Sequence, residues 1–144
     1  MSNSKLEKEF LSTQRAGTVH ENFLNHLKNP YNTKKFDLVN GTAKLTGKCG
    51  DAIKIDIYVA GNKIADICQT PYGCAYTIAC ASTVSCLSKG LRLAQAMALQ
   101  PEHVAEKLGG LPEDHMHCAR LAVNVLGEAI SDFLCRHPEN RKGI

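Results

Sequence analysis

The seven cysteines of this 144-residue chain include no Cys-x-x-Cys pair. Zinc ribbons and thioredoxin-type redox sites are usually built on such pairs, so both classes lose their usual sequence support. An odd number of cysteines in a chain without a secretory signal also argues against a framework of disulfides. We expect free thiols, and any site that they build must be gathered from distant segments.

Long apolar runs and concentrated positive charge are missing as well. No apolar stretch approaches the roughly 18 residues of a membrane span, and residues 1–14 lack the apolar core of a signal peptide. Lysine and arginine exceed aspartate and glutamate by only 17 − 14 = 3, and the basic residues are scattered. This pattern supports neither a nucleic-acid nor a membrane surface, and we expect a cytoplasmic protein.

What is present is enough apolar sequence for a single core, since 44% of the residues are hydrophobic. Residues 51–60 alternate between apolar and polar side chains, which is the pattern of a half-buried strand. Gly61-Asn62 suits a two-residue turn, so residues 63–70 should return antiparallel to that strand. Residues 41–46 predict a weaker third strand.

In the remaining segments, the apolar residues recur at helical spacing. A short helix from Val19 should end at Asn29-Pro30, because the residue before a proline disfavours helical geometry. A second helix over residues 75–89 should bury a stripe formed by Cys80, Val84 and Leu87. Shorter helices follow over residues 93–99 and 101–108.

The last helix has the clearest pattern, with an apolar stripe from Cys118 to Phe133 and Pro112, Glu113 and Asp114 suited to its first turn. Strands first and helices afterwards predict an α+β fold: a small three-stranded antiparallel sheet, helices packed on one face, and a long C-terminal helix. We place this domain at residues 18–137, between a mobile arm (1–17) and a C-terminal tail (138–144).

Three cysteines occupy the ends of these elements, where a loop can present a thiol. Cys49 precedes the alternating strand, Cys74 lies between a strand and a helix, and Cys118 begins the last helix. Asp51 shares the strand parity of Cys49 if the extended geometry continues backward. His117 and Cys118 are about 100° apart on a helix, so both can serve one site only if the backbone there is irregular or frayed.

Three thiolates, one imidazole and one carboxylate exceed the four ligands of a closed zinc site, and thiolates are the usual ligands of iron-sulfur clusters. Three functions stay open on the residues alone. The chain could be a scaffold for a labile cluster, a zinc-dependent sulfurtransferase that uses Cys49, Asp51, Cys74 and Cys118, or a zinc-stabilised interaction domain.

The other cysteines and histidines have simpler interpretations. Cys80, Cys68 and Cys135 are expected to pack in the core as small apolar side chains, and Cys86 to be structural. His115 could be an alternative ligand, but a solvated histidine at the start of a helix is the favoured interpretation. The remaining histidines are expected at the surface: His20, His26, His103 and His137.

Four segments together resemble a known family. Asn29-Pro30-x-Asn32, Cys49-Gly50-Asp51, Tyr72-Gly73-Cys74 and the stretch from Leu111-Pro112 to His117-Cys118 are similar, in order and spacing, to the IscU/NifU-type iron-sulfur cluster assembly scaffolds. The resemblance covers roughly residues 18 to 136. It implies an α+β fold of the SufE/NifU-like kind, with Cys49, Asp51, Cys74, His117 and Cys118 as the assembly site and Cys118 as the persulfide acceptor.

The resemblance also implies a 2Fe-2S cluster built from Fe²⁺, with Zn²⁺ able to replace it in the isolated protein. The implied partners are a cysteine desulfurase, a ferredoxin-type electron donor, apo iron-sulfur acceptor proteins and a second copy of the chain. Relatives that use a dedicated Hsp70-type chaperone carry Leu-Pro-Pro-Val-Lys before the His-Cys pair, whereas this chain has Leu111, Pro112, Glu113, Asp114 and His115. We therefore expect weak binding to such a chaperone.

Overall fold

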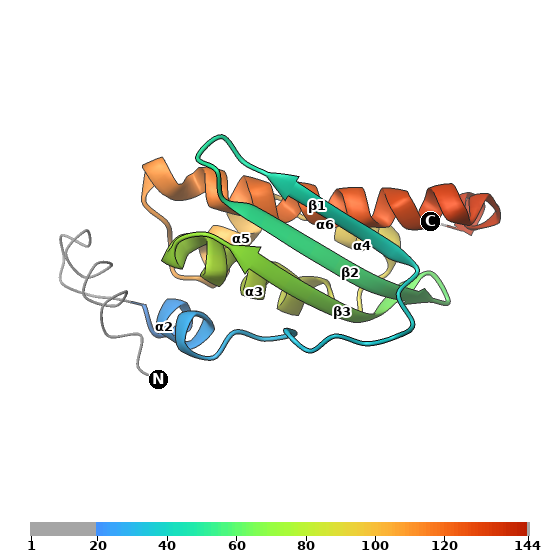
Figure 1. The fold of residues 1–144 in the computed structure, drawn as a ribbon, viewed down its shortest axis with the longest axis horizontal. Helices are drawn as coiled ribbons and strands as arrows, with labels where there is room; N and C mark the ends of the chain where they lie inside the picture. The colour runs from blue at the N-terminus through green and yellow to red at the C-terminus, as the bar shows by residue number, and fades with distance from the viewer. Residues whose placement is uncertain (1–19, 144) are drawn as a thin grey trace.

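The computed structural model describes residues 20–143, so the arm predicted over residues 1–17 lies outside the described residues. The described residues form one helix, three strands and then further helices (Figure 1). Their bounds are α2 (Glu21–Lys28), β1 (Gly41–Thr46), β2 (Ala52–Ala60), β3 (Lys63–Tyr72), α3 (Ala75–Ser88), α4 (Leu93–Met97), α5 (Pro101–Lys107), the 3-10 turn η1 (Glu113–His115), α6 (Met116–Arg136) and the 3-10 helix η2 (Pro138–Gly143).

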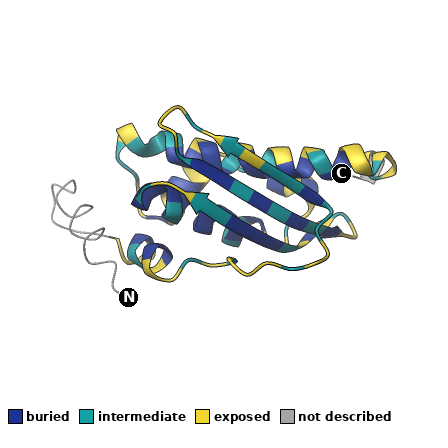
Figure 2. Cartoon of the chain, in the orientation of Figure 1, coloured by how far each residue is buried: buried dark blue, intermediate teal, exposed yellow. Residues whose placement is uncertain are grey.

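The sheet is antiparallel throughout, in the order β1-β2-β3. Its central strand alternates as the sequence predicts: Ile53, Ile55 and Ile57 are fully buried, whereas the residues between them are half-buried (Figure 2). Each isoleucine removed from water contributes roughly 1.5–3 kcal/mol. The predicted turn is confirmed, since Gly61 and Asn62 have φ values of 60° and 58°, the two positive angles of a type I′ hairpin.

Helices cover one face of the sheet, which confirms the predicted α+β architecture. In Figure 1, α3, α4, α5 and α6 lie behind the three strands, with α6 running along β1. A Cβ atom on Gly41 would lie 2.6 Å from the carbonyl oxygen of Ala129, so the close approach of β1 to α6 requires glycine there. Within residues 20–143, no helix combines the length and apolar character needed to cross a membrane.

Two helices differ from the sequence prediction. The stripe expected on α3 is only partly confirmed: Cys80 and Val84 are fully buried, but Leu87 is only half-buried and the helix is buried on nearly all sides. The turn predicted to open the last helix is also separate: residues 113–115 form η1, and α6 begins at Met116. A helix placed between a sheet and its neighbours needs no polar face, and the small side chains of α3 fit that crowded layer.

The segment between α2 and β1 runs along the edge of β3 (Figure 1). The carbonyl oxygen of Asn32 accepts a hydrogen bond from the Gln69 amide at 2.8 Å, and its side-chain amide donates to the Ser85 hydroxyl at 3.0 Å. Asn32 has a φ of 59°, a conformation that asparagine tolerates better than most residues. The Asn-Pro-x-Asn motif therefore attaches this segment to the sheet and to α3.

Candidate metal and sulfur site

The residues predicted for the site meet at one end of the sheet. The β1–β2 loop, the junction of β3 with α3 and the start of α6 lie together at that end (Figure 1). Cys49 lies in a tight turn closed by a hydrogen bond from the Gly50 amide to the Gly47 carbonyl at 3.0 Å. Gly50 has a φ of 87°, which explains the glycine between Cys49 and Asp51.

His117 joins the first and last parts of the site. Its Nε2 lies 3.4 Å from the Cys49 Sγ and 3.6 Å from the Cys118 Sγ. We expected that His117 and Cys118 could serve one site only if the helix were irregular or frayed. That expectation is wrong, because α6 is helical from Met116 onward. The imidazole is long enough to reach its neighbour's thiol across the helix surface.

Thr77 is a central residue of the site that the sequence analysis missed. Its buried hydroxyl donates a hydrogen bond to the Asp51 Oδ2 at 2.5 Å. The same oxygen lies 3.5 Å from the Cys118 Sγ and 3.7 Å from the Cys74 Sγ. The only sequence signal for it is its place three residues after Cys74, in the first turn of α3, where a hydroxyl can face the same end of the helix.

Asp51 is held against the start of α3. Burial raises the pKa of its carboxyl, but hydrogen bonds from the Thr77 hydroxyl and the Cys74 amide outweigh burial, so the pKa lies below its ordinary value. A Cβ atom on Gly73 would lie 2.6 Å from the Asp51 Cγ. The glycine before Cys74 therefore leaves the space that this carboxylate occupies.

Cys74 and Cys118 each shift the pKa of the other. A hydrogen bond from the Cys118 thiol lowers the pKa of Cys74 to about 5 despite partial burial, and the amides of Thr77 and Tyr76 at the start of α3 add to this effect. The same interaction, together with burial, raises the pKa of Cys118. Near neutral pH, the pair thus contains a thiolate at Cys74 and a thiol at Cys118.

The three site cysteines differ in their exposure. Cys49 is exposed and Cys74 is half-buried, but Cys118 is fully buried, so the expectation that each thiol is presented to solvent is wrong for Cys118. The first turn of α6 carries the apolar stripe of that helix, and Cys118 lies within it. Two thiols are accessible to a metal or a partner as the protein stands, and the third is not.

His115 is closer to this site than the sequence predicts. The expectation of a solvated residue is wrong, since its ring stacks on Tyr76 with centroids 3.7 Å apart and an interplanar angle of 14°. One ring nitrogen of His115 and the sulfur atoms of Cys74 and Cys118 all lie within 4.8 Å of one another. Such a group of donor atoms can bind a metal ion.

The other cysteines lie outside this group. Cys68 and Cys80 are fully buried, as predicted, and burial raises the pKa of each thiol. Cys86 is half-buried, and burial likewise raises its pKa. Cys135 was expected in the core and is exposed, because it follows the buried Phe133 and Leu134 on α6 and faces away from the sheet.

The surface prediction holds for two of the four remaining histidines, since His20 and His103 are exposed. It is wrong for His26, which is buried between α2 and α3 and whose Nδ1 lies 2.7 Å from the Ser82 hydroxyl. It is also wrong for His137, which is half-buried and stacks on Phe133 with centroids 4.6 Å apart. Both rings supply apolar contact that a helical pattern in polar sequence does not reveal.

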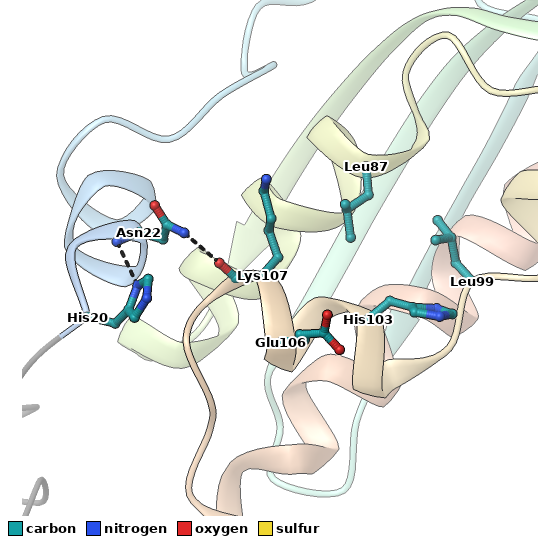
Figure 3. Close-up of a pocket in the computed structure, with 7 residues that line it drawn as sticks. All are labelled: His20, Asn22, Leu87, Leu99, His103, Glu106 and Lys107. Atoms are coloured by element: carbon teal, nitrogen blue, oxygen red, sulfur yellow. Dashed lines mark hydrogen bonds between the residues drawn. The ribbon is translucent and has the colours of Figure 1, made fainter.

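Two surface hollows differ in whether a partner bound there would contact the site residues. One hollow of about 480 Å³ opens beside Cys49 and His117, and Lys48 and Arg120 also line it. The other, of about 370 Å³, lies between α2, α3 and α5 and contains no cysteine (Figure 3). Its polar groups form hydrogen bonds with the backbone at helix ends: the side-chain amide of Asn22 donates to the carbonyl oxygen of Lys107 at 3.0 Å. The first hollow is therefore the candidate approach to the site.

Comparison with known proteins agrees with this geometry. Residues 18–140 match the family described as the NifU-like N terminal domain. The chain is 38% identical over 109 residues to the iron-sulfur cluster assembly scaffold protein IscU 1 of Archaeoglobus fulgidus, which covers 75% of this chain and 71% of the relative. It is 32% identical over 120 residues to the corresponding IscU of Aquifex aeolicus, with coverage of 81% and 76%.

A solved structure gives the same result for the fold. The NifU-like protein (N-terminal) from Brucella abortus superposes with a TM-score of 0.59 and 16% identity, over 78% of this chain and 92% of that chain. The family resemblance predicted from the four motifs is thus confirmed by sequence and the fold by structure. The chain belongs to the family of the NifU-like N-terminal domain.

Proposed function

We propose that this protein is a scaffold on which a labile 2Fe-2S cluster is assembled and then transferred to apo-proteins. One observation carries the proposal: three thiols, an imidazole and a carboxylate from three distant segments meet at one end of the sheet. Thiolates are the ligands that iron-sulfur clusters prefer, and mixed ligation suits a cluster that must leave. The relatives named above are scaffold proteins by their printed names.

In the proposed reaction, a cysteine desulfurase delivers sulfur as a persulfide. Cys118 first passes its proton to the Cys74 thiolate, to which it is hydrogen-bonded. The Cys118 thiolate then attacks the outer sulfur of the desulfurase persulfide, and the desulfurase cysteine leaves as a thiolate. Two electrons from a ferredoxin-type donor reduce the new persulfide to sulfide and the Cys118 thiolate. Because Cys118 is buried, delivery requires the site to open.

Two features of the surface bear on the partners. The cations Lys48 and Arg120 flank the hollow beside Cys49, and they would attract the negatively charged sulfur carried by a donor. Glu113 and Asp114 are exposed on η1, where chaperone-using relatives carry a proline and a valine, and His115 stands where they carry a lysine. We propose that an Hsp70-type chaperone specific for that basic peptide binds this chain weakly.

The first prediction tests the site with single cysteine variants. Cys49→Ser, Cys74→Ser and Cys118→Ser should each strongly reduce cluster formation during anaerobic reconstitution with iron, cysteine and a desulfurase, because each removes a thiolate ligand. The measurement is visible absorption of the cluster, followed by its transfer to an apo-ferredoxin. Cys135→Ser is the matched control, since this thiol is exposed and outside the site.

Two results would count against the proposal. Normal reconstitution by any two of the three site variants would refute the assignment of the ligands. A wild-type protein that stays colourless, retains zinc and still accepts persulfide sulfur would instead be a zinc-dependent sulfurtransferase.

A further inference from the structure

His115 has the surroundings of a ligand and not those of a solvated surface residue. Its side chain is only 27% exposed, and one face of the ring is covered by the buried Tyr76. The Nδ1 atom is buried and makes no hydrogen bond to any described residue. A buried polar atom without a partner costs free energy, and it calls for an explanation such as a missing ion.

The distances around His115 suit a single metal ion. Its ring nitrogen and the sulfurs of Cys74 and Cys118 lie within 4.8 Å of one another. A tetrahedral ion with metal–sulfur bonds of about 2.3 Å and metal–nitrogen bonds of about 2.0 Å holds such donors roughly 3.5–3.8 Å apart. A movement of about 1 Å or less per donor therefore closes the group around a metal. Thiolate and imidazole donors suit Zn²⁺ and Fe²⁺.

A carboxylate lies on the outer side of the imidazole. The His115 Nε2 is 4.0 Å from the Asp114 Oδ2. Histidines that bind metals commonly donate their second ring N–H to a carboxylate, which fixes the orientation of the ring. A small rotation of the exposed Asp114 side chain would complete that arrangement when the metal binds.

His117 also lies close to the Cys118 thiol. Its Nε2 lies close to both Cys49 and Cys118, and its ring centroid is 6.0 Å from that of His115. Two histidines thus lie near Cys118, each associated with a different second cysteine. The two histidines need not compete for one position.

We propose that Cys74, His115 and Cys118 form a mononuclear metal site that binds one Fe²⁺, or Zn²⁺ in its place, before Cys49 and His117 take part in building the cluster. The identity of iron as the natural metal rests on the function proposed above, whereas the ligand set rests on geometry alone. The alternative role for His115 is stacking on Tyr76 without any contact to metal.

Cobalt binding separates these two roles. We would titrate Co²⁺ anaerobically into the full chain and into His115→Phe, which keeps a stacking ring without a donor nitrogen, and His115→Gln, which does not depend on that ring. Wild type should show thiolate-to-cobalt charge transfer and tetrahedral visible bands at one equivalent. Both variants should bind Co²⁺ at least about tenfold more weakly, since losing even a group that only orients a ligand costs roughly 10- to 100-fold.

One comparison variant and a second spectrum complete the test. His103→Gln, at an exposed histidine on α5, should bind the first Co²⁺ as wild type does. One equivalent of Zn²⁺ should shift a ring nitrogen of His115 in two-bond ¹H–¹⁵N spectra. Unchanged Co²⁺ affinity and spectrum in both His115 variants, or a Zn²⁺-induced shift confined to His117, would overturn the proposal.

Reconstitution of the same samples keeps the two proposals apart. Wild type that forms a cluster while the His115 variants bind Co²⁺ normally would leave the scaffold function intact and remove the His115 site. Wild type that binds Co²⁺ through His115 but forms no cluster would support the His115 site and contradict the scaffold function. Melting temperatures identify a variant whose loss of binding comes from unfolding, and the folded member of the pair then decides the result.

Discussion

The Thr77 hydroxyl has a single proton to donate but three site residues around it. The short contact with Asp51 takes that proton, so the Cys118 thiol can only donate to the hydroxyl oxygen, and the Cys74 thiolate has no proton to donate. The Cys118 proton is therefore held between the Thr77 oxygen and the Cys74 thiolate. One uncharged residue thus contacts the ionised carboxylate and both sulfur atoms.

The second prediction concerns the charge on Cys74. Cys118→Ala should raise the pKa of Cys74 from about 5 toward its ordinary value of 9.0, because the thiol that stabilises the anion most is removed. The amides of Tyr76 and Thr77 remain, so the rise should be incomplete. Alkylation of Cys74 by iodoacetamide, followed across pH by mass spectrometry, gives the midpoint in each protein.

Cys135→Ala is the control for this measurement, since it removes an exposed thiol outside the site. Equal Cys74 midpoints in wild type and Cys118→Ala would show that the helix amides alone hold the thiolate. The interaction of the two sulfurs would then lose its role in the proposed sulfur transfer.

At the scale of the elements, the site depends on how closely β2 approaches the start of α3. Gly73 makes that approach feasible, because any side chain there would meet the Asp51 carboxylate. Its backbone is not left-handed, so the requirement for glycine is contact and not conformation. The glycine of the Tyr-Gly-Cys motif therefore has a different physical reason from that of the Cys-Gly-Asp motif.

The third prediction follows from this contact. Gly73→Ala should push Asp51 away from Thr77, lower stability by about 1–3 kcal/mol and reduce the yield of reconstituted cluster. Urea denaturation and visible absorption measure the two effects. Gly61→Ala is the matched control: it lies in open space at a φ of 60°, so it should cost about 1 kcal/mol and leave the cluster yield unchanged. Equal cluster yields in the two variants would contradict this role of Gly73.

The docking of α2 on α3 depends on a neutral histidine. The Ser82 hydroxyl oxygen accepts a hydrogen bond from the Tyr31 amide at 2.9 Å, which leaves its own proton to donate to the His26 Nδ1. Burial lowers the pKa of His26, and Lys107 lowers it further. Below pH 6.5 the unfolded chain therefore takes up a proton that the folded protein takes up only at lower pH.

The fourth prediction is that acid weakens the fold through His26. Since the unfolded state binds more protons in this window, the free energy of unfolding should fall as pH decreases from about 7 toward and through the folded-state pKa of His26. Urea denaturation at several pH values measures that slope. His26→Gln should flatten it, even if its overall stability is lower, whereas His103→Gln, at an exposed histidine, should not. An unchanged slope in His26→Gln would rule out this origin.

The sequence predicted well the strands and turns that have a regular local pattern. It predicted poorly which residues are buried where two elements meet. The alternation predicted over residues 51–60 and the Gly61-Asn62 turn are local patterns, and the structure shows both, with the strand at Ala52–Ala60. The burial of Cys118 and His26 depends on neighbours from α3, which is distant in the chain and buried on nearly all sides. Periodicity reports which face of one element is apolar, but not how many elements surround it.

For the whole molecule, the motifs pointed to five residues, and three segments do bring them to one end of the sheet. Two further residues lie with them: Thr77 was not predicted, and His115 was considered as an alternative ligand but expected to be solvated. Thr77 is a small polar residue within an apolar helix, a position that helical spacing treats as background. His115 owes its burial to the ring of Tyr76, which lies 39 positions earlier in the chain. Contacts of this kind come from tertiary packing and leave no local signal.

The last prediction is that Asp51 keeps the cluster transferable. Carboxylate oxygen is a harder ligand than thiolate and suits iron-sulfur centres less well, so Asp51 can compete for iron without closing the site. Asp51→Ala should therefore give a cluster that survives longer in air and moves more slowly to an apo-ferredoxin. Losing the hydrogen bonds to Thr77 and the Cys74 amide should also cost about 1–2 kcal/mol of stability. Cluster half-life and urea denaturation on the same two proteins separate the roles. A less stable variant whose cluster lasts no longer would reduce Asp51 to a residue that only fixes the β2–α3 contact.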